Sequence, residues 1–273
     1  MCAMKSIGTR AGADIPVPSP HKLAFDSITE GGAKWLDWIG GSQRFEGILK
    51  ARVPWDQLND GEKRFVGEKL KELPPNIQLV LNSLYVTMVA GFEEFLRSSI
   101  KFLVASVTGR ACKYDDIKES IILMNIRESA RLLRRMDSPP EYLLFSTPEL
   151  CRGIGSCVPG SQQVELNSSA IADVDGLIRL DSFFDRVGYF GKDLSWDVLG
   201  KNPNLREALG IKSGGAREAG KQLSLELQAI SRNRNRIAHT GGEASDVTSH
   251  LLGEHRNLLS SLSLAVDQAL VEV

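Results

Sequence analysis

The stretch Ser231–Gly242, which reads SRNRNRIAHTGG, holds the residues whose types and spacing could do chemistry. An arginine presents a planar fork of N–H donors that matches phosphate oxygens. His239 can give or take a proton near neutral pH. Such a pair suffices for metal-free RNA cleavage, in which the histidine assists attack by the ribose 2′-hydroxyl or protonates the leaving 5′-oxygen, and the arginine stabilises charge on the phosphate. DNA lacks that hydroxyl and would be spared.

Helical spacing leaves two arginines open as the partner of His239. Asn235 lies four residues before the histidine and shares its face. Arg232 lies seven residues before it and is nearly on the same face, whereas Arg234 lies five residues before it and points elsewhere on a straight helix. Arg234 and His239 would converge if the helix ended near Ala238, as the following Thr-Gly-Gly permits, or across the two-fold axis of a dimer.

Arg234 also falls on the apolar stripe of its own predicted helix, in step with Leu223, Leu227 and Ile230. A cation on a packed face is costly unless it is paired. On a long upstream helix, Glu93 is likewise a charge on an apolar face, so the simplest expectation pairs Glu93 with Arg234. A structural salt bridge would explain that pair by itself, but the histidine at the end of the same helix favours a functional site.

The sequence RNRIAH at residues 234–239 resembles the R-x4-6-H motif of the HEPN superfamily, and VAGFEEFLRSSI at residues 89–100 resembles the first core helix of that superfamily. The resemblance implies an all-α homodimer whose two motifs face each other across the interface. It also implies a metal-independent endoribonuclease that serves as a toxin of a toxin–antitoxin pair, or as an antiviral, abortive-infection effector in a bacterial defence locus. The general arrangement is similar to the large HEPN proteins associated with RiboL-PSP.

The resemblance also implies roles for individual residues. Carried onto this chain, Arg234 handles the phosphate, Asn235 is the polar neighbour and His239 is the catalytic histidine. Arg232 satisfies the motif at its six-residue spacing, so the choice of arginine stays open. The acidic residue of the core helix is either Glu93 or Glu94.

Two non-enzymatic alternatives remain open on the sequence alone. Some HEPN members only bind or dimerise, so this chain could be a helical module that binds RNA, a nucleotide or a partner protein. It could also be a regulatory subunit that neutralises, or is neutralised by, a cognate protein such as an antitoxin or a nucleotidyltransferase. The binding module would keep Arg234 and Glu93 as a structural pair and use the basic face for docking.

The elements that must position these residues are all helices. Apolar residues recur at spacings of three and four, and no series of strands is evident. The pattern therefore predicts an all-α multi-helix bundle with a flexible tail over residues 1–20, a single domain over 21–273 and an irregular insertion near 146–170. Helices are expected at residues 30–40, 61–73, 76–107, 115–136, 171–188, 204–210, 214–239 and 246–273.

Composition narrows the protein class. The 273 residues carry a net charge of −1, which gives no global case for nucleic-acid or membrane binding. Locally, residues 201–236 hold eight Lys and Arg against three Glu, and residues 127–136 form a second cationic patch. The N-terminus has no secretory signal, no apolar run is long enough for a membrane span, and the four cysteines lack zinc or redox spacing. A cytoplasmic protein that needs no metal or cofactor is expected.

Overall fold

The computed structural model of the chain describes residues 19–34, 37, 59–61, 64, 77–110, 113–135, 146–240 and 247–271. Within these ranges every regular element is a helix, and no strand occurs. The all-α prediction is therefore confirmed for the described part of the chain.

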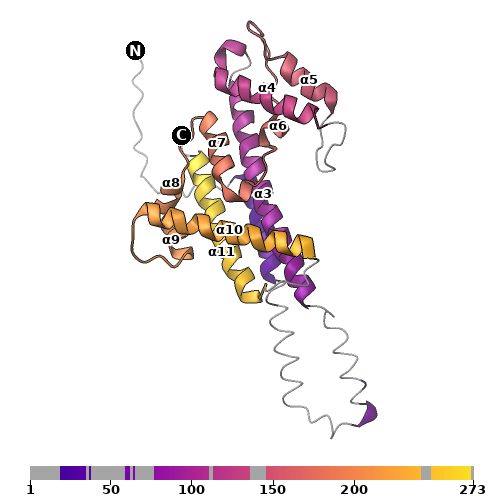
Figure 1. Cartoon of the computed structure of the whole chain (residues 1–273), viewed down its shortest axis with the longest axis vertical. Coiled ribbons are helices and arrows are strands. Elements are labelled where there is room, and N and C mark those ends of the chain that lie inside the picture. The colour runs from indigo at the N-terminus through magenta and orange to yellow at the C-terminus, as the bar shows by residue number, and fades with distance from the viewer. Residues whose placement is uncertain are drawn as a thin grey trace, which may run out of the picture.

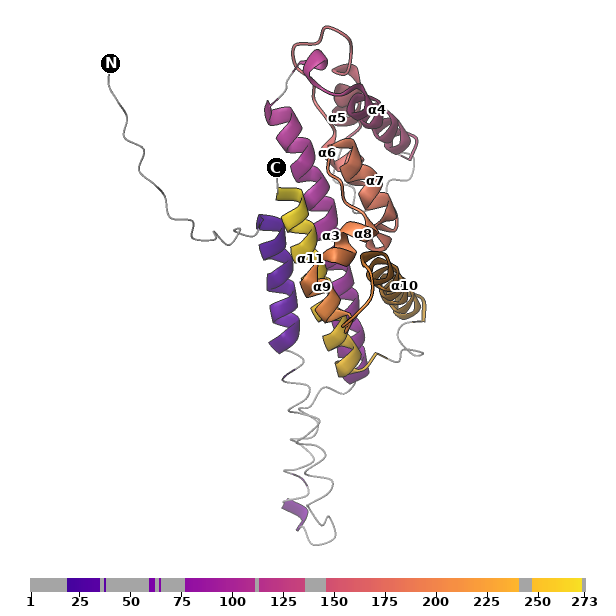
Figure 2. The same ribbon diagram turned by 90° about the vertical axis from the view of Figure 1, so that its left-hand side faces the viewer.

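The long axis of the molecule is built on helix α3, Ile77–Arg110. Its apolar positions are buried at the expected spacings, including Tyr85, Phe92 and Leu96, each 0% exposed. Helix α11, Ser249–Val271, and a helix over residues 20–34 run alongside it (Figures 1 and 2). Phe25 joins the N-terminal helix to α3, since its ring centroid lies 5.7 Å from that of Phe92. These three helices contribute much of the main hydrophobic core, which the other helices complete.

Helix α10, Ala216–Thr240, crosses this group at a steep angle (Figure 1). The N-terminal half of α10 packs closely on the short helix α8, Trp196–Lys201, which α9, Pro203–Ala208, follows. Two glycines permit this approach. A Cβ on Gly200 would lie 2.0 Å from the Ala216 carbonyl oxygen, and one on Gly220 would lie 2.5 Å from that of Trp196. The crossing fixes how α10 projects its C-terminal half over α3.

A second group of helices covers the upper end of α3 (Figures 1 and 2). It consists of α4, Glu119–Leu133, α5, Thr147–Gly155, α6, Ser168–Ala172, and α7, Asp181–Tyr189, with the 3₁₀ turns η2, Tyr114–Asp116, and η3, Leu177–Arg179. Helix α6 packs on both α3 and α4, so this group is continuous with the core helix.

The structure corrects several predicted boundaries. Helix α3 continues past Thr108 to Arg110, because neither Thr108 nor Gly109 prevents a further helical turn. Asp115 and Asp116 form a 3₁₀ turn rather than the start of α4. Part of the irregular segment predicted near 146–170 is helical. A capping box joins Ser146 to Glu149 and starts α5 there, and this signature outweighs the local glycines.

The N-terminal predictions fall mostly outside the described residues. The helix expected over residues 30–40 begins earlier, at Pro20, where proline is compatible with a first helical turn. Of the helix expected over 61–73, residues 61 and 64 are described and are helical. Residues 1–18 of the predicted tail, and both Trp35 and Trp38, lie outside the described ranges.

Contrary to the expectation that no apolar run is long enough for a membrane span, residues 78–109 of α3 are long and apolar enough to cross a membrane when judged by length and composition alone. The same test is passed by the core helix of a water-soluble protein. Here α3 packs against helix 20–34, α10 and α11, so the chain is not clearly a membrane protein.

Candidate functional site

Helix α10 remains regular through His239 to Thr240. Of the two ways in which Arg234 and His239 could converge, a helix end near Ala238 is not what the structure has, because the helix-breaking glycines of the sequence come only after Thr240. Five residues at about 100° each separate Arg234 from His239 by about 140° around the axis. The two side chains therefore leave different faces of the helix, and within one chain they are not brought together.

Arg234 is turned toward α3. Its Nη2 lies 4.0 Å from Oε2 of Glu93, with the two side chains 38% and 15% exposed. The expected pairing of Glu93 with Arg234 is therefore present, at the long limit of an ion pair. Nη1 of Arg234 donates a 3.0 Å hydrogen bond to Oδ1 of Asn235, while its buried Nε has no hydrogen-bond partner among the described residues. The long ion pair leaves the guanidinium able to meet another anion.

Glu94 lies on the solvent side of α3 instead. Its carboxylate accepts a hydrogen bond from Ser98 Oγ at 3.3 Å and lies 3.7 Å from Nη1 of Arg97. The residue is exposed and belongs to a pair within its own helix. Of the two acidic candidates, only Glu93 lies beside the motif helix.

Arg232, Asn235 and His239 form a separate row on α10. Their positions fall within about 60° around the axis and span about 10 Å along it. Arg232 and His239 are exposed and Asn235 is half-buried. This row offers a guanidinium, an amide and an imidazole to the same approaching ligand, and the long arginine side chain can shorten the gap to the histidine.

A buried polar cluster lies between the motif helix and the core, and the sequence did not predict it. The hydroxyl of Tyr85 on α3 lies 2.7 Å from Nδ1 of His255 on α11. The side chain of Asn233 on α10 also hydrogen-bonds to that hydroxyl. A signal was available, because His255 falls on the apolar spacing of Leu252 and Leu259. Through Asn233, which directly precedes Arg234, the cluster links α10 to the core helices α3 and α11.

Burial sets the protonation states of this cluster. It raises the pKa of the Tyr85 hydroxyl, although the Asn233 hydrogen bond and the charge of Arg236 act in the opposite direction. It also lowers the pKa of the His255 imidazole, against a smaller opposite influence of Glu254. In the tautomer of the neutral imidazole that carries its proton on Nε2, the protonated phenol of Tyr85 donates its O–H to Nδ1. The tyrosine oxygen is then left to accept from Asn233.

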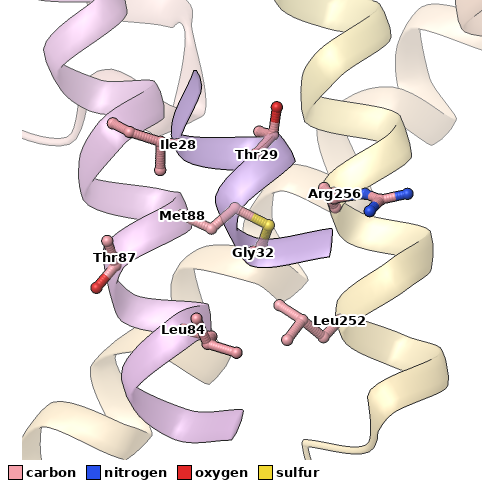
Figure 3. A pocket seen from close by; sticks show the side chains of 8 residues that line it. All are labelled: Ile28, Thr29, Gly32, Leu84, Thr87, Met88, Leu252 and Arg256. Atoms are coloured by element: carbon pink, nitrogen blue, oxygen red, sulfur yellow. The ribbon is translucent and has the colours of Figure 1, made fainter. Parts of the chain in front are cut away.

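An apolar pocket opens between helix 20–34, α3 and α11 (Figure 3). Its volume of about 30 Å³ has room for about two water molecules, which is too little for a nucleotide or another substrate. On α3 the pocket is lined by residues 84, 87 and 88. This side of the helix lies about 150° around the axis from the side that carries Tyr85, Val89 and Glu93. The lining residues are Ile28, Thr29, Gly32, Leu84, Thr87, Met88, Leu252 and Arg256.

Within the described ranges, no three His, Cys, Asp or Glu side chains come together in a way that could hold a metal ion. In comparisons with known proteins, no family model, no curated protein and no solved structure matches this chain.

Proposed function

We propose that the protein is a metal-independent endoribonuclease of HEPN type, active as a homodimer in the cytoplasm. His239 takes the proton of the attacking ribose 2′-hydroxyl or donates a proton to the leaving 5′-oxygen. Arg234 stabilises the charge that builds on the phosphate, and Asn235 holds the guanidinium of Arg234 through the 3.0 Å hydrogen bond. The role of such an enzyme would be that of a toxin or an antiviral defence effector, restrained by a cognate protein.

The observation that carries the proposal is the arrangement of charged groups along α10. Arg232, Arg234 and Asn235 precede an exposed His239 on the last turns of one regular helix. Arg234 lies on the packed side of α10, where its Nη2 is 4.0 Å from Oε2 of Glu93, the longest distance that counts as an ion pair. A guanidinium that is 38% exposed and so weakly paired can bind a ligand phosphate.

The divergence of Arg234 and His239 supports a composite site. Groups about 140° apart on a straight helix act on one phosphate only if they come from two chains. A two-fold axis near the C-terminal end of α10 would bring the Arg234 of one protomer to the His239 of its partner. Arg232, which shares a face with His239 in the same chain, supports the phosphate beside it.

The test is cleavage of total cellular RNA in EDTA by the wild type, His239→Ala, Arg234→Ala and Arg232→Ala. The proposal expects cleavage that survives chelation, produces 2′,3′-cyclic phosphate ends and is lost in the first two variants. His250→Ala, which replaces a histidine whose side chain is 82% exposed on α11, serves as a matched control and should cleave as the wild type does. Absence of cleavage by folded wild-type protein between about pH 6 and 8, where histidine changes its charge, would point to the non-catalytic binding module.

A further inference from the structure

Helix α4 and the turn that follows it carry a row of arginines far from the motif in the sequence. Arg127, Arg131, Arg134 and Arg135 fall within about 100° around the helix axis, and they span about 12 Å along it. The side chains of Arg127, Arg131 and Arg135 are 60%, 27% and 44% exposed, and Arg134 is also exposed. The row forms a straight cationic edge rather than a cup.

Two buried carboxylates anchor the inner side of this row. Oε1 and Oε2 of Glu128 lie 3.1 and 2.8 Å from the Nε atoms of Arg127 and Arg131, respectively, and Nη2 of Arg186 on α7 lies 2.8 Å from Oε1. Asp173 accepts from Nη2 of Arg131 at 2.8 Å. Burial alone would raise the pKa of the Glu128 carboxyl, but hydrogen bonds from Arg186 and Arg131 outweigh it and hold that pKa below its ordinary value. The Glu128 carboxylate is therefore ionised and contacts three guanidinium groups, and Asp173 contacts those of Arg131 and Arg135.

The cluster keeps an excess of positive charge after these pairs are made. The cluster has five guanidinium groups, on residues 127, 131, 134, 135 and 186, and two carboxylates, on residues 128 and 173, an excess of three positive charges among the described residues. Arg135 lies 3.9 Å from Asp173, at the limit of an ion pair. Nη1 of Arg186 is buried without a hydrogen-bond partner among the described residues. Guanidinium N–H donors therefore outnumber the carboxylate oxygens of residues 128 and 173, both in the buried part of the cluster and at its surface.

We propose that this arginine cluster binds the phosphate backbone of single-stranded RNA at a position separate from the motif on α10. The inference rests on the proposed function, because it assumes that RNA is the substrate. Guanidinium groups match phosphate oxygens in geometry as well as in charge. A straight edge of about 12 Å suits successive phosphates of an extended strand better than it suits a single small anion. The cluster contributes affinity and orientation without reading bases.

The location of the cluster gives it a distinct role. Helix α4 lies toward one end of the long axis, whereas α10 crosses near the middle (Figures 1 and 2). RNA that reaches both must run along the molecule. The cluster therefore favours long substrates over short ones, and it holds the strand while the motif acts on it.

The experiment measures RNA affinity rather than cleavage, in protein that carries His239→Ala so that the RNA stays intact. Binding of a labelled single strand is followed between 50 and 200 mM salt. A triple variant with Arg127→Gln, Arg134→Gln and Arg135→Gln is compared with its parent. Arg131 and Arg186 are kept because their buried pairs hold α4, α6 and α7 together. The matched control replaces three exposed cations outside the cluster, Lys118, Arg152 and Arg179, by Gln.

Each phosphate contact that is lost should lower the slope of log K against log salt by about 0.7 for a single strand. Three lost contacts lower it by about 2 and weaken binding about 100-fold at 0.1 M salt, while the control variant changes little. The single variant Arg135→Gln, with a loss of about 0.7 in slope, replaces the triple variant if that one fails to fold. An unchanged slope in a folded variant overturns the proposal.

Two further outcomes separate this inference from the proposed function. Cluster-dependent RNA binding together with no cleavage by wild-type protein would keep the RNA-binding surface and reject the nuclease. Cleavage together with an unchanged salt slope would keep the nuclease and reject the surface. If the triple variant loses binding to polyglutamate but not to RNA, the ligand is an acidic protein and the RNA assignment is wrong.

Discussion

Replacement of His255 should remove a pH dependence of stability that the buried cluster creates. His255 is 6% exposed, and its Nδ1 shares a hydrogen bond with the hydroxyl of Tyr85. Because burial lowers the pKa of its imidazole, the folded chain resists a proton that the unfolded chain accepts below about pH 6.5. A base whose pKa is lower in the folded state than in the unfolded state makes the protein less stable as the pH falls, because protonation favours the unfolded state.

The magnitude follows from this linkage. If the folded state binds no proton at His255, the free energy of unfolding falls by about 1.2 kcal/mol between pH 7 and pH 5.5, and this is the upper limit for one histidine. Carboxylates contribute little in this window because they titrate at lower pH. The buried Glu128, whose pKa is lowered, loses its stabilising contribution only as the pH falls through the acid range.

The assay is urea unfolding followed by far-ultraviolet circular dichroism at several pH values between 5.5 and 7. The wild type should lose stability across this range, and His255→Gln should lose up to about 1.2 kcal/mol less. His250→Gln is the control, since His250 is 82% exposed and pairs with Glu254 on the surface. Equal slopes in the wild type and His255→Gln would refute the reasoning that a neutral, buried imidazole joins α3 to α11.

Two further substitutions test the packing that positions α10. Gly200→Ala should destabilise the protein by about 1–3 kcal/mol or more, because the added Cβ would meet the backbone of α10 at 2.0 Å. Gly188→Ala is the control, because a Cβ at that position has open space and should not destabilise the protein. Both variants are compared by thermal melting, and equal melting temperatures for Gly200→Ala and Gly188→Ala would argue against the close crossing of α8 and α10. Tyr85→Phe keeps the ring but removes its hydrogen bonds, and should cost about 1–3 kcal/mol in urea unfolding. A cost near zero would mean that the cluster does not hold α10 in place.

Periodicity was sufficient to predict the long helices. The apolar spacings around Phe92 and Leu227 correspond to the buried faces of α3 and α10, because helices of this length bury one continuous stripe. Short helices were harder to predict. Helix α8 was missed because its six residues span too few turns for a pattern to emerge, and its position depends on Gly200 meeting α10 far along the chain.

The candidate site was predicted in part. An arginine on an apolar stripe and an acid on another stripe were enough to predict the contact between Arg234 and Glu93. The sequence could not decide whether α10 stops before His239, because a Thr-Gly-Gly stop allows either end point. Nor did it indicate that Tyr85 and His255 meet, since a contact between residues 170 positions apart depends on how three helices pack.

The most direct test of the composite site mixes two inactive proteins. Arg234→Ala and His239→Ala are unfolded together, refolded as mixed dimers and assayed for RNA cleavage in EDTA. If Arg234 of one protomer serves His239 of its partner, half of the dimers regain one of two sites, and about a quarter of the wild-type activity returns. Mixing Arg232→Ala with His239→Ala should restore none of the activity that depends on Arg232. Arg232 and His239 act from the same protomer, and no protomer of such a mixed dimer has both residues intact. No activity from the first mixture, with active wild-type protein treated in the same way, would contradict the account.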